Sequence, residues 1–305
     1  MSQRLATIVS FTQFQVKALW SFSRPDLRTA ALVTTLLDPD IGNFDFVEDL
    51  VDRPLDEILE HLEGLFKYRK PYDLILVYYA GLGLINGDGQ VYLATVDTDP
   101  KSLADTAIPA AVLNSWMDNS FSRQQNLIFD NHFVRINEAG ELTLLAEDPD
   151  PVEAFRGKGY WRLLLSSSVN ASSTREHETV LAHSPSPSMS DLIIRGLETG
   201  DADVDKDGLI GLRDLYSYLK EEMQWREIGQ KPELYAFLEK EDFVLAKTVT
   251  IAQQAKRIKW DVLSGAITLP IAILILGGRA DLIISIEATI IFLLFYAILY
   301  RYGDG

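Results

Sequence analysis

DLILVYYAGLG, residues 73–83, is an apolar run that ends in two glycines separated by a leucine. A continuously apolar run of this length is typical of a strand buried on both faces of a parallel sheet. We therefore expect a strand over residues 73–79 that ends at the glycines. A second run, NLIFD at residues 126–130, predicts another buried strand, and Asn131, His132 and Phe133 follow it.

Strand-like and helix-like patterns alternate along roughly the first 250 residues. Apolar runs of strand length lie at 5–10, 44–51, 91–96 and 161–167, and helical spacing of apolar residues at 26–37, 54–68, 110–117 and 189–197. This alternation predicts an α/β fold with three layers and a mostly parallel sheet. Residues 132–158 and 171–188 are polar and contain proline, so we expect loops there.

The two strand ends resemble the catalytic motifs of caspase-like (C14-type, clan CD) peptidases. In that family the histidine of a YYSGHG strand end is the general base, and the second cysteine of an LLLDCCYSG strand end is the nucleophile. The matching positions here are Leu82 and His132. The resemblance covers about residues 27–247, and it is strongest to caspase-like proteins of bacterial conflict and defence systems. It implies a caspase-like, three-layer α/β fold. Further matching stretches are LLDPDIGNFDF at 36–46, VYLATVDTDPKSLADTAIPAAVL at 91–113, RLLLSSS at 162–168 and GLETGDADVDKDGLIGLRDLYSYL at 196–219.

Composition excludes the chemistry of a cysteine peptidase. The chain contains no cysteine, and a thiolate nucleophile needs sulfur and a base beside it. Leu82 can neither accept nor donate a proton, so the resemblance implies a pseudoprotease and not an enzyme. We expect His132 to be a neutral filler, since no other histidine stands at ligand spacing from it.

Asp130 keeps the residue type of the family. In relatives that cut after basic residues, the matching aspartate lines an acidic pocket for the basic side chain. Asp130 is therefore a candidate for holding a Lys or Arg of a partner peptide. The alternative left open is that its carboxylate only accepts hydrogen bonds from nearby backbone N–H groups.

An acidic loop at residues 203–214 has the spacing of a calcium-binding EF-hand loop, D-x-D-x-D-G-x5-[DE]. Asp203, Asp205 and Asp207 would supply carboxylate ligands, the backbone carbonyl of Leu209 a further one, and Asp214 the last. Asp214 is shorter than the usual glutamate, so magnesium could replace calcium. The alternative is a solvated helix–loop–helix that is stabilised by its caps alone.

Two long apolar runs, residues 262–278 and 282–300, stand near the C-terminal end, and three residues separate them. Each is just long enough to cross a bilayer as a helix, which predicts a tight transmembrane hairpin after a caspase-like domain over 1–250. Residues 251–261 form a linker with three basic residues, and Arg301 follows the second run. The positive-inside rule then places the large domain and the C-terminus in the cytoplasm. The alternative is a pair of buried core helices.

Two functions are left open by these patterns. In the first, the chain is a membrane-anchored scaffold or regulator in a bacterial conflict, defence or signalling system, and it binds an active protease or a sensor of that system. In the second, clustering of the cytoplasmic domains makes a homo-oligomer whose hairpins form a pore. Glu287 fits this reading, because an ionisable residue within a span usually faces protein or water. The alternative is that Glu287, only six positions into the second run, reaches the lipid headgroups. The net charge of −16 argues against a nucleic-acid partner.

Overall fold

The computed structural model describes residues 2–22, 29–137, 139–144, 151–158, 162–169, 188–226, 230–236 and 242–248. The chain divides into two compact units, Met1–Thr248 and Val249–Gly305. All of the described residues belong to the first unit. The predicted hairpin, residues 262–278 and 282–300, and the linker before it lie outside the described residues. Within the described part, no helix has the length and apolar character needed to cross a membrane.

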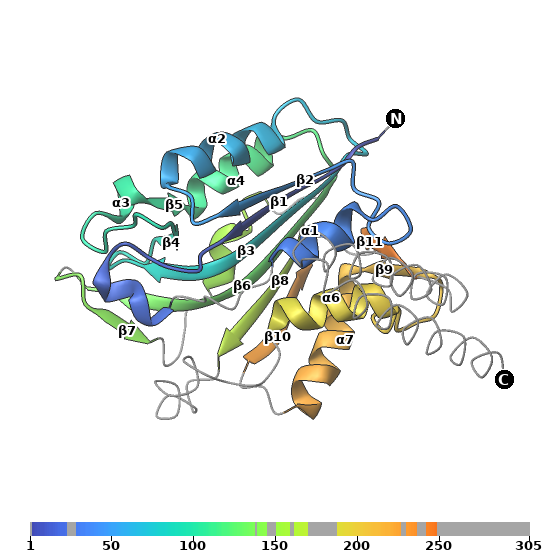
Figure 1. The fold of residues 1–305 in the computed structure, drawn as a ribbon. Coiled ribbons are helices and arrows are strands. Elements are labelled where there is room, and N and C mark those ends of the chain that lie inside the picture. Colours follow the sequence, from blue (N-terminus) through green and yellow to red (C-terminus); the bar gives the residue numbers. More distant parts are fainter. Residues whose placement is uncertain are drawn as a thin grey trace, which may run out of the picture. The chain divides into compact units, whose positions relative to one another are not determined.

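A mostly parallel sheet runs through the first unit (Figure 1). Its main strands follow the order β2-β1-β3-β6-β8-β10. The first five are parallel to their neighbours, and only β10 runs antiparallel to β8. Their bounds are β1 Arg4–Ser10, β2 Phe46–Val51, β3 Leu74–Ile85, β6 Gln124–Ile136, β8 Arg162–Val169 and β10 Gln230–Ala236. The prediction of an α/β fold with a mostly parallel sheet is confirmed.

Five short strands complete the β structure of the described residues. Three extend the main sheet: β4 pairs with β3 and β5, and β7 pairs with β6. The other two, β9 and β11, form a separate antiparallel pair. The bounds are β4 Val91–Ala94, β5 Ala107–Pro109, β7 Leu142–Leu144, β9 Leu209–Gly211 and β11 Val244–Lys247.

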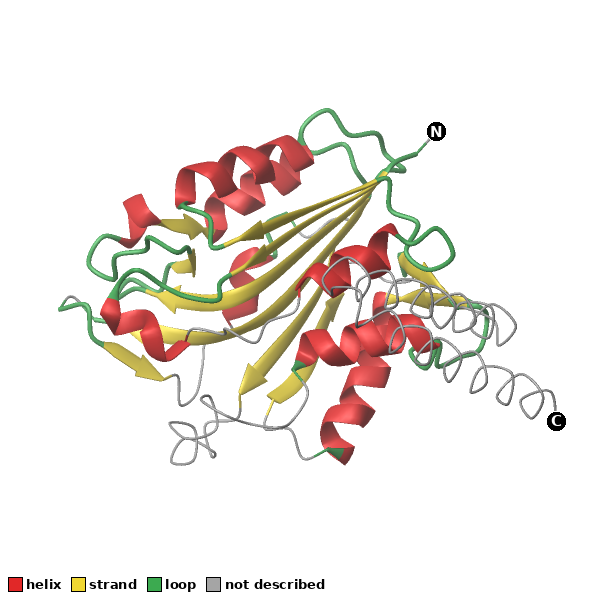
Figure 2. Ribbon diagram, viewed as in Figure 1, coloured by secondary structure: helices red, strands yellow, loops and turns green. Residues whose placement is uncertain are grey.

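Helices cover both faces of the sheet, which gives three layers (Figures 1 and 2). Helices α2 and α4 lie on one face, and α1, α6 and α7 on the other. A one-turn helix, α3, and two 3-10 helices, η1 and η2, lie in the connections. The bounds are α1 Thr29–Leu37, α2 Leu55–Phe66, α3 Leu103–Thr106, α4 Ala110–Asn119, α6 Met189–Thr199, α7 Leu212–Trp225, η1 Lys17–Phe22 and η2 Pro151–Phe155.

The core under α2 and α4 is built from alternate residues of the central strands. Buried strand residues such as Val77 and Phe129 meet Ile58 and Leu62 of α2 in one cluster. The apolar residues of α2 recur every three or four positions, so one face of the helix is buried while its acidic residues face water. This packing holds the central strands, β3 and β6, in place.

Two of the expected strand boundaries are wrong. β3 does not end at Tyr79 but continues to Ile85, and β6 continues past Asp130 to Ile136. Part of the expected loop over 132–158 is therefore strand, followed by β7 and η2. The physical reason is that β3 and β6 pair with each other along this whole extension, which satisfies their backbone groups.

Candidate functional site

The two positions that resemble a catalytic dyad lie side by side in the sheet. β3 and β6 are parallel neighbours, and their register pairs Leu82 with His132. Paired residues of adjacent strands stand about 5 Å apart. A base and a nucleophile need positions of this kind, because the base must reach the nucleophile's proton. The fold thus brings together two positions that are distant in the sequence, and they are occupied by a leucine and a histidine.

Leu82 is fully buried and belongs to the core cluster beneath α2 and α4. On one edge of β3, pairing with β1 ends at Ala80 and pairing with β4 begins at Gly83. In the gap between these partners, the Tyr79 hydroxyl accepts the Leu82 N–H at 3.1 Å. The same hydroxyl lies within donating distance of the carbonyls of Leu82 and Ala94, at 3.0 and 2.8 Å. A side chain therefore replaces the missing strand partner at the dyad position.

Burial raises the pKa of Tyr79, although its hydrogen bonds to the two carbonyls act in the opposite direction. Tyr79 is thus a neutral phenol that donates and accepts hydrogen bonds. Its ring packs against Phe11 and Phe129. This environment suits a structural role for Tyr79.

The glycines on either side of Leu82 are explained by packing. A Cβ atom on Gly83 would lie 2.1 Å from a ring carbon of Phe133, which occupies the space above it. A Cβ atom on Gly81 would lie 2.6 Å from the Tyr79 hydroxyl oxygen and 2.9 Å from the Phe11 ring. Packing of neighbouring side chains thus explains the two glycines that match the family motif.

Asp130 is fully buried on β6, and its neighbour in the register of β3 is Ala80. The Tyr78 hydroxyl donates a hydrogen bond of 3.0 Å to its carboxylate. Asp130 therefore has no exposed surface in this structure. Its role in holding a basic side chain of a peptide stays a prediction, and it would require the carboxylate to become accessible.

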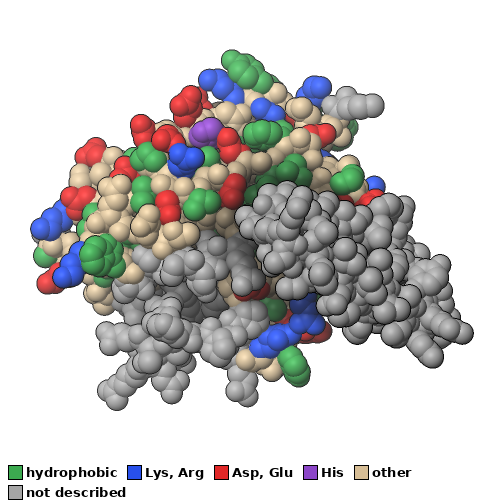
Figure 3. Space-filling model, viewed as in Figure 1, with side chains coloured by type: hydrophobic (Ala, Val, Ile, Leu, Met, Phe, Trp, Pro, Cys, Tyr) green, Lys and Arg blue, Asp and Glu red, His purple; other side chains and the backbone are tan. Residues whose placement is uncertain are grey.

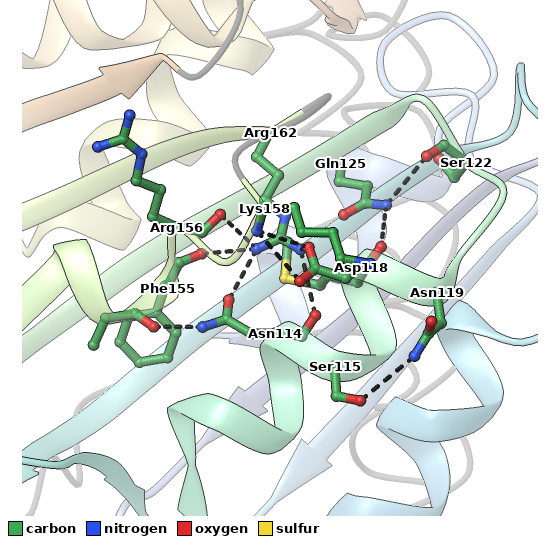
Figure 4. Close-up of polar contacts among 12 residues, drawn as sticks. Asn114, Ser115, Asp118, Asn119, Ser122, Gln125, Phe155, Arg156, Lys158 and Arg162 are labelled. Atoms are coloured by element: carbon green, nitrogen blue, oxygen red, sulfur yellow. Dashed lines mark hydrogen bonds and ion pairs between the residues drawn. The ribbon is translucent and has the colours of Figure 1, made fainter.

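The buried Arg162 holds the segment at η2, which lies between β6 and β8 in the chain (Figure 4). Arg162, at the start of β8, donates to the carbonyls of Phe155 and Arg156 at 3.1 and 2.9 Å. It also donates to the Asn114 side chain and forms an ion pair with Asp118, both on α4. Burial lowers the pKa of Arg162 and Asp118 raises it, but a guanidinium keeps its charge in proteins. One side chain thus joins β8, α4 and the segment at η2.

The acidic loop brings its first three carboxylates together. Oxygen atoms of Asp203, Asp205 and Asp207 lie within 4.8 Å of one another, close enough to hold one metal ion. Backbone N–H groups turn inward as well, since those of Asp207 and Gly208 donate to Asp203. Gly208 has a φ of 90°, a left-handed conformation that favours glycine. The loop geometry that the spacing predicts is therefore present for these three ligands.

Asp214 has a second role that the spacing does not reveal. Its carboxylate accepts the Gly211 N–H at 3.0 Å in the capping box that begins α7. Burial, together with the charges of Asp205, Asp242 and Asp207, raises the pKa of Asp214, although the Gly211 N–H acts in the opposite direction. Asp214 thus lies near enough to the other carboxylates to feel their charge.

Two residues that the sequence pattern does not reveal, Thr248 and Asp242, also contribute to the acidic loop. The Thr248 hydroxyl donates to Asp203 at 2.7 Å, and Asp242 accepts the N–H groups of Leu212 and Arg213 at the start of α7. Burial opposes ionisation of Asp203, but hydrogen bonds from Thr248 and from backbone N–H groups outweigh it and lower its pKa. Thr248 is the last described residue before the second unit. No local pattern marks either contact.

Comparison with known proteins shows no matching family model and no matching curated protein. Among solved structures, the chain is similar to the crystal structure of a structural-genomics target from Geobacter sulfurreducens. The TM-score is 0.45 at 10% sequence identity, and the match covers 82% of this chain and 95% of that one.

Proposed function

We propose that this chain is a catalytically inactive caspase-like protein that acts as a protein-binding scaffold or regulator at a membrane, in a bacterial conflict, defence or signalling system. The observation that supports it most is the register of β3 and β6. It pairs Leu82 with His132, the two positions that sequence motifs alone matched to the base and the nucleophile. Two motif matches that are made independently of each other thus meet at one place in the fold.

The surroundings of these positions support the loss of catalysis. Leu82 is packed into the core, and the chain has no cysteine to act as a nucleophile. β3 and β6 run on past the dyad positions as paired strands instead of opening into a cleft. With its reaction centre filled in this way, the scaffold would bind other proteins without cutting them.

The pore-forming alternative is favoured by Glu287, which stands within the second apolar run. Both readings place the chain in the membrane through residues 262–300, and they differ in whether those residues anchor it or conduct ions. They also share the cytoplasmic location of the first unit. Membrane depolarisation on expression, and its loss in Glu287→Leu, would support the pore over the scaffold.

We expect the full chain to remain with membranes after a carbonate wash, because insertion of two spans is effectively irreversible. Capture of the chain from detergent extracts of those membranes should recover a partner protein of full length in amounts comparable to the bait. A reporter fused after Gly305 should be cytoplasmic, and one inserted at Gly278 external.

Other outcomes of that experiment would count against particular parts of the proposal. A full chain that is soluble and monomeric without detergent would show that the apolar runs are core helices. Recovery of partners as fragments, with cleavage that depends on this chain, would reject the inactive scaffold. A membrane-bound chain without any stoichiometric partner would favour the pore.

We further propose that the acidic loop binds calcium through Asp203, Asp205 and Asp207, with Leu209 and Asp214 completing the loop. Bound calcium would neutralise the mutual repulsion of these carboxylates. An ion that binds only the folded state at a hundredfold excess over its Kd stabilises it by about 2.7 kcal/mol. For a unit of this size we expect millimolar calcium to raise the Tm by roughly 5–10 °C.

The melting experiment needs a matched control, because Asp203 also stabilises the loop without an ion. Asp203→Asn with Asp205→Asn should lower the Tm and abolish its increase with calcium. Asp201→Asn, an exposed neighbour outside the spacing, should retain the full increase. An identical calcium shift in the double variant would show that the ion binds elsewhere, and no shift in the wild type would leave the loop with a capping role only. A parallel titration with magnesium distinguishes the two ions.

A further inference from the structure

An exposed surface that is both basic and aromatic lies where α2 and α4 end. Tyr68, Tyr72 and Phe121 are 89%, 74% and 73% exposed, which is unusual for large aromatic side chains near one another. We call this the basic-aromatic surface, and it consists of these three residues with Lys67, Arg69, Lys70 and Arg123. In Figure 3, Lys and Arg side chains stand beside hydrophobic ones at the top of the view, where Figure 1 shows the loop after α2.

The two loops that form this surface are joined. The Arg123 N–H donates a hydrogen bond of 3.0 Å to the Pro71 carbonyl, which holds the loop after α4 against the loop after α2. Between the helix ends lies a cavity of about 260 Å³ whose lining includes Phe66, Tyr68, Trp116 and Phe121. Tyr68 and Phe121 therefore line one apolar hollow, and the joined loops carry Tyr72 next to Pro71.

The charge of this face is opposite to that of the chain. The net charge is −16, yet residues 67–72 contain three basic residues and no acidic one. The neighbouring Asp73 is buried, where it accepts the N–H groups of Gln3 and Lys70. Glu63, the exposed acidic residue at this end of α2, pairs with Lys67 at 3.4 Å. The outward-facing groups are thus predominantly positive, which complements an anionic partner.

We propose that the basic-aromatic surface rests on an anionic lipid bilayer. Tyrosine and tryptophan rings favour the level of the lipid headgroups, and basic residues there are attracted by anionic lipids. The Lys67 ammonium lies 5.8 Å from the Tyr68 ring centre, so charge and ring are presented together. A bilayer is flat and meets only this face, whereas a long nucleic acid would also meet the acidic remainder of the chain.

This inference goes beyond the proposed function and draws on it in one respect. If residues 262–300 anchor the chain, the bilayer lies within reach of the first unit, which raises the effective concentration of lipid at its surface. Contact through the basic-aromatic surface would then fix which face of the first unit is turned toward the membrane. The rest of the first unit's surface would stay accessible to protein partners.

The test is a hydroxyl-radical footprint of the full chain on vesicles of phosphatidylcholine with and without phosphatidylserine. Oxidation of Tyr68, Tyr72 and Phe121 should fall severalfold only when phosphatidylserine is present. Trp225, which is 75% exposed and distant from this surface in the sequence and the fold, serves as the reference and should not change.

Matched variants separate the surface from general charge. Lys67→Gln with Lys70→Gln should abolish the protection, while Lys101→Gln with Lys220→Gln, which removes the same charge from exposed positions elsewhere, should retain it. Sedimentation with phosphatidylcholine alone reports on the anchor. Sedimentation there, with no added protection by phosphatidylserine, would overturn the inference but leave the anchor in place. Protection by phosphatidylserine without such sedimentation would support the surface and reject the anchor.

Two further outcomes would overturn the lipid proposal. A chain that associates with neither kind of vesicle would overturn the surface and the anchor together. Protection of the same aromatic residues by single-stranded RNA in the absence of lipid, with no effect of phosphatidylserine, would identify a nucleic-acid surface and overturn the lipid proposal.

Discussion

Replacing Arg162 with methionine is expected to lower the free energy of unfolding of the first unit by about 3–5 kcal/mol, the cost of breaking a buried ion pair by removing one partner. Methionine retains much of the volume but leaves Asp118 without its guanidinium. The carbonyls of Phe155 and Arg156 would lose their donor as well. Carbonyl groups left without a donor add to the loss, because they gave up hydrogen bonds to water on folding and would have no replacement.

Urea unfolding of the full chain in detergent, followed by intrinsic fluorescence, measures this effect. The matched control is Arg156→Met, because the Arg156 side chain is 59% exposed and its ion pair with Glu153, at 3.5 Å, is exposed as well. That change should stay within about 0.5 kcal/mol of the wild type. Equal and small effects for both variants would contradict the buried role of Arg162.

Replacing Leu82 with histidine, the residue of the motif that this segment resembles, is expected to destabilise the chain by about 3–5 kcal/mol, because a leucine is lost from the core and a polar ring is buried in its place. Leu82 is fully buried among apolar residues, and its own backbone groups are already bonded to Tyr79. Position 82 belongs to the apolar core, so we expect a histidine to fit it poorly.

The control for Leu82→His is Leu84→Met, two residues further along the same strand. Leu84 is also fully buried, and a volume-conserving exchange there should cost less than about 1.5 kcal/mol. If Leu82→His had the stability of the wild type and its imidazole titrated at an ordinary pKa, position 82 would be open to water. The proposal that the reaction centre is filled would then be wrong.

The central strands could be predicted from sequence because their burial leaves a clear pattern. The apolar run at 73–79 requires a site with two covered faces, and β3 provides it. The continuation through Gly81 and Gly83 could not be predicted, since glycine has a low preference for strands. What extends β3 is pairing with β6 on one edge and the Tyr79 hydroxyl on the other. Both depend on the assembled fold.

In the acidic loop, too, some contacts could be predicted from the local sequence and others depend on the assembled fold. Alternating aspartates before Gly208 lie within one turn of chain, so local geometry brings Asp203, Asp205 and Asp207 together. The contact from Thr248 comes from 45 residues away and leaves no trace in the local sequence. Arg162 is an intermediate case. It opens an apolar strand and is easily taken for an exposed strand end, yet a lone charge beside a buried run also indicates a buried partner.

The measurement that tests the central proposal most directly is peptide hydrolysis by the full chain. Purified protein is incubated with fluorogenic peptides that contain Arg, Lys or Asp at the cleavage position, with and without calcium. We predict background rates under every condition, because the chain has no cysteine to supply a thiolate and Leu82 cannot act as a base. Hydrolysis above background that co-purifies with the chain and is lost in His132→Ala would contradict the assignment as an inactive caspase-like protein.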